Sequence, residues 1–190
     1  MKSLSILIPI YNEEESLQAL FDELKFSFEN NQSIEIIFIN DGSSDMSQKV
    51  IENEIANHST WKLINLYRNY GKSVALQSGI DIASNELIAT LDGDLQDDPK
   101  ELISLVRELN EDDVIVGWKK NRLDPLEKKI ASKVFNFFIK LFSGLKIKDS
   151  NSGIKVLKKE VAKSLNLYGG RHRYIPLLAH QKGFNVKEIP

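Results

Sequence analysis

The chain has 190 residues with 27 acidic and 25 basic side chains, and 42% of its residues are hydrophobic, so it can bury one good core and is most simply one domain. It contains no Cys, which excludes disulfides, thiolate metal sites and a Cys nucleophile. No run of 18 apolar residues occurs, and the apolar run near the N-terminus is too short for a signal peptide, so neither a membrane-spanning helix nor a leader is expected.

The near-neutral total hides two halves of opposite charge. Residues 1–117 hold 8 Lys and Arg against 22 Asp and Glu, a net charge of −14, whereas residues 118–190 hold 17 against 5, a net charge of +12. This split predicts two surfaces with different partners, with solvated helix faces as the alternative. Basic residues attract nucleic acid, an anionic membrane surface or a phosphorylated acceptor. No nucleic-acid-reading motif accompanies them, so we expect no nucleic-acid partner.

In the first 117 residues, strand patterns alternate with helical ones. Short apolar runs predict strands, and apolar residues spaced three and four apart predict helices. The expected strands are Leu4–Ile10, Ile34–Asn40, Trp61–Leu66, Glu86–Leu91 and Val114–Gly117. The expected helices cover 17–28, Val50–Ile55, Val74–Ala83 and 102–109. The alternation predicts an α/β fold, a mostly parallel sheet with helices on both faces.

Two polar signals predict where helices begin. Asn12, followed three residues later by Glu15, resembles a capping box and places the start of the first helix near residue 13. Asp97 or Asp98, just before a proline, is typical of the residue that precedes a helix.

The pattern changes after Trp118. One amphipathic helix is expected over Leu126–Phe142, and its basic and aromatic side chains suit either a membrane surface or an ordinary core helix with a wet face. Further strands are expected at Gly153–Leu157 and Asn185–Pro190.

The stretch ATLDGDLQDDP, residues 89–99, is the most informative part of the chain. An apolar run ends at Leu91 and is followed at once by Asp92 and Asp94, as expected where a buried strand leads into a loop. Ligands of open α/β sheets bind at that end of the strands. Two carboxylates flanking the small Gly93 repel each other unless a cation lies between them, and a hard divalent cation with room for substrate phosphates fits. A helix-capping loop explains the later acidic residues but leaves this pair unexplained.

Four loops that follow predicted strands now combine with three later segments. The loops are PIYNEE (9–14), NDGSSD (40–45), RNYGK (68–72) and LDGDLQDDP (91–99), and the segments are GWKKNRLDP (117–125), KDSNSGIK (148–155) and LYGGRHRYIP (167–176). Together they resemble the family 2 glycosyltransferases of GT-A fold, in the branch of dolichol-phosphate mannose synthases and related polyprenyl-phosphate sugar transferases. The resemblance implies a single GT-A catalytic domain over residues 1–190, Rossmann-like, with a nucleotide-sugar donor half at 1–117 and a basic acceptor half at 118–190.

The resemblance also implies roles for individual residues. Those expected to bind substrate are Pro9, Tyr11, Glu13, Asp41, Arg68, Lys72, Lys119, Lys155 and Arg173. The expected ligands of Mg²⁺ or Mn²⁺ are Asp92, Asp94 and Gln96, and the expected catalytic residues are Asp94 and Asp149. Asp41 would hold the base or ribose of the nucleotide, and His172 with Arg173 would close over the site.

Several of these residues have a plainer explanation as well. Arg68 also suits a surface ion pair, Lys72 a solvated helix, and His172 a structural role in the core. Asp45 is expected to cap a helix rather than to bind a ligand. The order of the motifs along the chain favours function for the aspartates of the donor half.

The activity implied by the resemblance is inverting, metal-dependent transfer of a hexose from a UDP- or GDP-sugar to polyprenyl or dolichyl phosphate. A lipid phosphate needs positive charge more than deprotonation, because the second pKa of a phosphomonoester is about 6. Two alternatives stay open. Transfer to a saccharide hydroxyl needs a general base such as Asp149, and a nucleotide-sugar-binding module needs no turnover at all.

The chain departs from the family's pattern at Lys119 and Lys155, where relatives usually carry Arg, whose bidentate grip on phosphate Lys lacks. Relatives also continue past Pro190, often into membrane helices that this chain does not include. The resemblance implies a cytoplasmic enzyme, peripheral at the cytoplasmic face of the membrane. It leaves the oligomeric state open, with a homo-oligomer as one option.

Overall fold

A seven-stranded sheet with strand order β3-β2-β1-β4-β6-β5-β7 forms the centre of the computed structural model, which describes residues 2–28, 31, 33–118, 145, 147 and 152–189. The strands are β1 (Leu4–Ile10), β2 (Ile34–Asn40), β3 (Trp61–Asn65), β4 (Leu87–Thr90), β5 (Val114–Gly117), β6 (Lys155–Lys158) and β7 (Val186–Ile189). The helices are α1 (Leu17–Phe28), α2 (Ser47–Ile55), α3 (Lys72–Ile82), α4 (Pro99–Glu108), α6 (Lys159–Ser164), the 3₁₀ helix η1 (Arg171–Tyr174) and α7 (Ile175–Gln181). Within these ranges no helix is both long and apolar enough to span a bilayer.

The sheet is mostly parallel, as the alternation of elements predicts. Strand β1 pairs in parallel with β2 and β4, and β2 pairs in parallel with β3. Strand β6 is antiparallel to both of its neighbours, β4 and β5, while β5 and β7 are parallel. The first four strands therefore end at one edge of the sheet.

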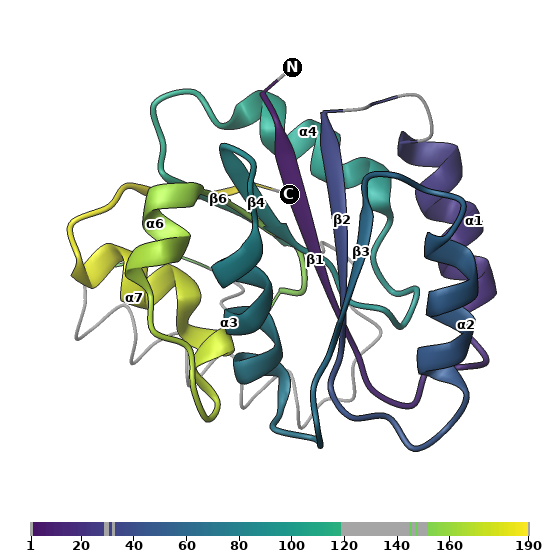
Figure 1. Cartoon of the computed structure of the whole chain (residues 1–190). Coiled ribbons are helices and arrows are strands. Elements are labelled where there is room, and N and C mark those ends of the chain that lie inside the picture. The colour runs from purple at the N-terminus through teal and green to yellow at the C-terminus, as the bar shows by residue number, and fades with distance from the viewer. Residues whose placement is uncertain are drawn as a thin grey trace, which may run out of the picture.

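Helices cover both faces of the sheet (Figure 1). Helices α1, α2 and α4 pack on one face, and α3, α6 and α7 pack on the other. Every residue of β2 is buried, and its side chains alternate between the two cores: Phe38 packs with the first group of helices, and Ile37 and Ile39 with the second. A strand buried on both faces reads as a continuous apolar run, which explains why β2 was recognisable in the sequence.

The later strands return to the same edge of the sheet. Strand β5 runs parallel to β4 and ends at Gly117, and the antiparallel β6 begins close to that end. The backbone N–H of Gly117 donates to the carbonyl of Ile154 at 3.2 Å. The segment between these two residues therefore starts and finishes at the edge where β4 ends. The helix expected over Leu126–Phe142 lies outside the described residues.

The first helix begins at Leu17, so the capping-box prediction for its start is wrong. Asn12 has a positive φ of 55°, and its Oδ1 accepts a hydrogen bond from the backbone N–H of Ser44 at 2.8 Å. The loop after β1 is thus tied to the loop after β2 instead of capping its own helix. At α4 the prediction is confirmed, because Asp98 is the cap and accepts from the N–H of Lys100 at 2.9 Å.

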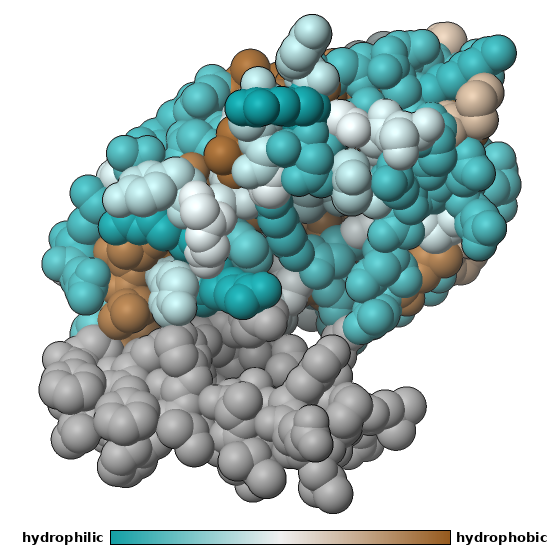
Figure 2. All heavy atoms as spheres, turned by 90° about the horizontal axis from the view of Figure 1, so that it is seen from below, coloured by the Kyte–Doolittle hydropathy of each residue, from teal (hydrophilic) through white to brown (hydrophobic). Residues whose placement is uncertain are grey.

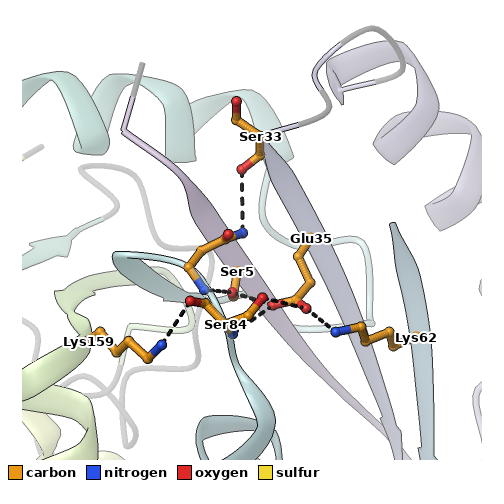
Figure 3. A network of polar contacts seen from close by, with 7 residues as sticks. Ser5, Ser33, Glu35, Lys62, Ser84 and Lys159 are labelled. Carbon is orange, nitrogen blue, oxygen red and sulfur yellow. Dashed lines mark hydrogen bonds and ion pairs between the residues drawn. The ribbon is translucent and has the colours of Figure 1, made fainter. Parts of the chain in front are cut away.

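A buried carboxylate, Glu35, joins several elements at the opposite edge of the sheet (Figure 3). It accepts hydrogen bonds from Ser5 Oγ at 2.5 Å, from Ser84 N and Oγ at 3.1 and 3.0 Å, and from Lys62 Nζ. Burial by itself raises the pKa of this carboxyl, but the bonds from Lys62, Ser5 and Ser84 outweigh it and hold the pKa below its ordinary value of 4.5. Glu35 therefore stabilises the fold as a charged group.

We expect the substitution Glu35→Gln to lower the free energy of unfolding at pH 7 by about 2 kcal/mol, because hydrogen bonds to charged groups are worth about 1.5–3 kcal/mol. Since the pKa of Glu35 is lower in the folded than in the unfolded state, its contribution is present above pH 4.5 and is lost as the pH falls further. Urea unfolding of both proteins at pH 7 and at about pH 3 measures this. A difference in stability that stays the same at both pH values would contradict the assignment.

Candidate active site

An open cavity of about 280 Å³ lies at the edge where β1, β2 and β4 end. Its lining comes from four loops that are far apart in the sequence and meet because parallel strands end together. Figure 2 views the molecule from this edge, and the described surface around the strand ends is largely hydrophilic.

Most of the predicted donor-site residues line this cavity. They are Pro9, Tyr11, Glu13, Asp41, Lys72, Asp92 and Asp94. The cavity is also lined by four residues to which the sequence analysis assigned no binding role, Ile10, Asn69, Gly71 and Gly93. Arg68, Gln96, Lys155 and Arg173 are not part of its lining, and Lys119 and Asp149 lie outside the described residues.

Asp41 holds the loop that follows β3. It is buried, and its two carboxylate oxygens accept from the backbone N–H groups of Tyr70 and Gly71, each at 2.8 Å. The adjacent Gly42 has a φ of +68°, and a Cβ built there would lie 2.3–2.6 Å from the backbone of Arg68 and Asn69. The close approach leaves room only for glycine, so the Asp-Gly pair fixes where the 68–71 loop runs.

The same loop places Asn69, not Arg68, in the cavity. Arg68 is exposed, and its guanidinium carbon lies 5.0 Å from the centroid of the Tyr70 ring, a cation–π arrangement on the surface. Gly71 has a φ of +89°, which favours glycine, and it directly precedes α3. A glycine before a helix is the sequence signal from which this turn into the site could have been expected.

Lys72 and Asp92 form an ion pair between Nζ and Oδ1 inside the cavity. Lys72 is the first residue of α3, and Asp92 follows β4 by two residues. Their side chains are 34% and 28% exposed, so the pair is only partly screened by solvent. The N-terminus of α3 adds a partial positive charge beside the lysine. The carboxylate after β4 therefore faces positive charge from α3.

Asp94 lies exposed on a strained turn of the same loop. Its Oδ1 accepts from the backbone N–H of Gln96 at 3.1 Å, and Leu95 between them has a φ of +60°, a conformation uncommon for residues other than glycine. The Gln96 side chain is exposed and does not line the cavity.

The donor atoms at this site fit Mg²⁺ or Mn²⁺ that shares its ligands with a substrate. In the part of the chain that the structure describes, no group of three or more His, Cys, Asp or Glu residues is arranged to hold a metal ion. Asp92 and Asp94 nevertheless offer carboxylate oxygens to one cavity. Mg²⁺ is typically bound by one or two carboxylates, with substrate phosphates and water as the remaining ligands. The pair therefore suits a hard cation that arrives with a phosphorylated ligand.

Gly153 lies against the acidic loop. A Cβ built on it would lie 2.3 Å from Asp97 Oδ2 and 3.0 Å from Cγ and Oδ2 of Asp92. Thr90 Oγ1 donates to the carbonyl of Gly153 at 2.7 Å and fixes this approach. Two carboxylates thus reach the same point of the backbone only because residue 153 has no side chain.

His172 lies beside the start of α3, next to the main cavity. Ser73 Oγ accepts from the backbone N–H of His172 at 3.0 Å and lies 2.9 Å from its Nδ1. Burial, followed by the charges of Lys72, Arg173 and Lys155, lowers the pKa of His172 to about 4. The imidazole is therefore neutral at pH 7 and joins η1 to α3 without adding positive charge.

Lys155 and Arg173 occupy different environments. Lys155 is buried at the start of β6, where its Nζ donates to the carbonyl of Ser152, and it lines a small polar cavity together with Lys72 and His172. Arg173 is exposed. Lys155 thus contributes a buried positive charge close to the Lys72–Asp92 pair.

Comparison with known proteins identifies the family of the chain. The chain matches the family model described as "Glycosyl transferase family 2" over residues 5–165. It is 38% identical over 178 residues to the dodecaprenyl-phosphate galacturonate synthase of Rhizobium johnstonii, a match that covers 91% of this chain and 53% of that protein. It is 35% identical over 194 residues to the undecaprenyl-phosphate 4-deoxy-4-formamido-L-arabinose transferase of Yersinia pestis, covering 100% of this chain and 59% of that protein. The chain thus spans little more than half the length of these two relatives.

Solved structures show the same architecture. The mannosyltransferase PcManGT from Pyrobaculum calidifontis, solved in complex with GDP-Man and Mn²⁺, matches with a TM-score of 0.75 at 14% identity, covering 100% of this chain and 55% of that chain. The fold is GT-A, as the sequence motifs predict. Because the family model covers most of the sequence, including the loops that build the cavity, this chain belongs to glycosyl transferase family 2.

Proposed function

We propose that this chain is the catalytic domain of an inverting glycosyltransferase that moves a sugar from a nucleoside diphosphate to a polyprenyl phosphate. The observation that carries the proposal is the cavity at the ends of β1, β2 and β4, which is lined by Asp94 and by the Lys72–Asp92 ion pair. The two curated relatives, both named for polyprenyl-phosphate substrates and matched over 91% and 100% of this chain, support the choice of acceptor. The donor is a UDP- or GDP-sugar.

The donor half of the domain, residues 1–117, would bind the nucleotide. Tyr11 is 47% exposed at the cavity and offers its ring to the base, while Asp41 faces the same space. Each oxygen of Asp41 already accepts one backbone N–H, but a carboxylate oxygen has a second lone pair for a base or ribose group. The diphosphate would then lie toward Lys72 and the aspartates after β4.

Asp92 and Asp94 would hold Mg²⁺ or Mn²⁺ together with the donor diphosphate. When bound, the ion would neutralise charge on the departing nucleoside diphosphate as a Lewis acid. The task of Asp94 is therefore to bind the ion and orient the donor, while Lys72 supplies a second positive charge to the same phosphates. The strained turn at Leu95 holds Asp94 at the opening of the cavity.

The acceptor half, residues 118–190, would bind the lipid phosphate. Its net charge of +12 suits an anionic acceptor and an anionic membrane surface. This charge supports the proposal that the enzyme binds peripherally to the cytoplasmic face of a membrane. Lys119, Lys155 and Arg173 are the proposed phosphate-binding residues, and Asp149 the proposed base or positioning group. A phosphate that is already anionic can attack the anomeric carbon directly, and a single displacement inverts its configuration.

We expect Asp94→Ala to lower sugar transfer by at least about a hundredfold, since losing one electrostatic contact to developing charge typically costs a factor of 10²–10³. The measurement is release of nucleoside diphosphate from UDP- and GDP-sugars with Mn²⁺ and polyprenyl phosphate in detergent. Asp98→Ala is the matched control on the same loop, because Asp98 caps α4 and does not line the cavity. It should cost about 1 kcal/mol of stability and leave transfer unchanged.

Transfer by the Asp94→Ala protein at the wild-type rate would overturn the metal assignment. If the unaltered chain binds nucleotide sugars with Mn²⁺ but releases no diphosphate, a binding module without turnover replaces the proposed transferase. Transfer to a water-soluble saccharide in place of the lipid would show that the acceptor group is a saccharide hydroxyl and not a lipid phosphate.

Gly153→Ala tests the approach of the two carboxylates to the backbone. The new methyl group would meet the buried Asp97 and the ion-paired Asp92, so we expect displaced carboxylates and some loss of stability. The thermal stabilisation that UDP or GDP gives with Mn²⁺ should fall by at least half. Gly117→Ala is the control, since its Cβ would have its nearest contact at an ordinary 3.6 Å. Equal stabilisation of both variants and the wild type would contradict this role.

A further inference from the structure

We propose that Lys72 competes with the divalent cation for Asp92. In the donor-free protein Lys72 forms an ion pair with Asp92, and when a diphosphate binds, the lysine pairs with the phosphates and leaves the carboxylate to the cation. The inference builds on the proposed donor site and adds a residue that couples the binding of the cation to the binding of the nucleotide. It predicts that the cation and the nucleotide each bind weakly alone and tightly together.

The contact itself is the first argument. Lys72 Nζ is bonded to Asp92 Oδ1, so one of the two carboxylates available to a cation is already paired with a positive charge. Asp94 lines the same cavity but is exposed to solvent, and a single exposed carboxylate binds a hard cation weakly. A cation that is to use both aspartates must therefore displace the lysine.

The surroundings of Lys72 supply the second argument. Among the described residues, Lys72 is the one basic residue in the lining of the cavity, and it stands at the N-terminus of α3, which carries a partial positive charge. Its ammonium group is therefore best stabilised by an anionic partner. Asp92 provides one before the donor binds, and the donor's diphosphate provides another because it lies in the same cavity.

Charge balance then links the two ligands. When the diphosphate enters, Lys72 can exchange a carboxylate for a phosphate without losing its ion pair, and Asp92 becomes available to the cation. By reciprocity, whatever the nucleotide adds to the affinity for the cation, the cation adds to the affinity for the nucleotide. Direct ligation of the cation by the diphosphate also couples the two ligands, so the contribution of Lys72 is the part of the coupling that disappears when its charge is removed.

The test uses Lys72→Met, which keeps the apolar stem and removes the charge, and Lys72→Arg, which keeps the charge. Isothermal calorimetry gives the Kd of Mn²⁺ alone, of UDP and GDP alone, and of each nucleotide with saturating Mn²⁺. We expect Lys72→Met to bind Mn²⁺ alone about tenfold more tightly than the wild type, and to show a correspondingly smaller gain in Mn²⁺ affinity when nucleotide is added. Lys72→Arg should behave like the wild type.

Lys158→Met is the matched control, because Lys158 pairs with Asp113 at 2.7 Å and has a side-chain exposure of 28%, close to that of Lys72, but lies outside the cavity. It removes the same formal charge and should leave Mn²⁺ affinity unchanged. Unchanged or weaker binding of Mn²⁺ alone by Lys72→Met would overturn the inference. Failure of the wild type to bind any nucleoside diphosphate with Mn²⁺ would instead overturn the donor site, and the experiment with Mn²⁺ alone would still decide the role of Lys72.

Discussion

Carboxylates at the ends of buried strands are the constraint on which this site depends. Asp41 is buried and the Asp92 side chain is 28% exposed, so the first charge requires partners within the protein and the second is only partly stabilised by solvent. Asp41 is satisfied by two backbone N–H groups of the neighbouring loop, and Asp92 by the lysine at the start of α3. The partners of these two aspartates fix the course of the 68–71 loop and the position of the first turn of α3. The contacts that stabilise the two carboxylates therefore also determine the shape of the cavity.

The sheet was predictable where burial dictates composition. Strands β1 and β2 are apolar because both of their faces are covered by helices, and their bounds agree with the sequence prediction. The antiparallel placement of β6 between β4 and β5 was not expected, since strand order depends on packing between distant segments that no local pattern records. The start of α1 was missed for a similar reason: Asn12 makes its hydrogen bond to a residue 32 positions away.

The sequence predicted which loops form the candidate site, but not which side chains contact one another there. The motifs identified the loops that meet at the cavity, because each follows a strand that ends at the same edge. They did not show that Arg68 stacks on Tyr70 at the surface while Asn69 lines the cavity, since adjacent residues of a turn point in different directions. The buried Glu35 also escaped notice, because its partners Ser5, Lys62 and Ser84 come from three other parts of the chain.

The junction between β5 and β6 has a consequence for how such a domain can diversify. Val116 is paired in register with Lys155, and Gly117 donates a hydrogen bond to Ile154. The two ends of the stretch between β5 and β6 are therefore held next to each other by the sheet. The cost of closing a loop rises only slowly with its length. Such a stretch tolerates exchange or extension without disturbing β1, β2 and β4. Apart from Gly153, residues 118–153 can therefore vary in sequence and length while the loops that line the cavity keep their places.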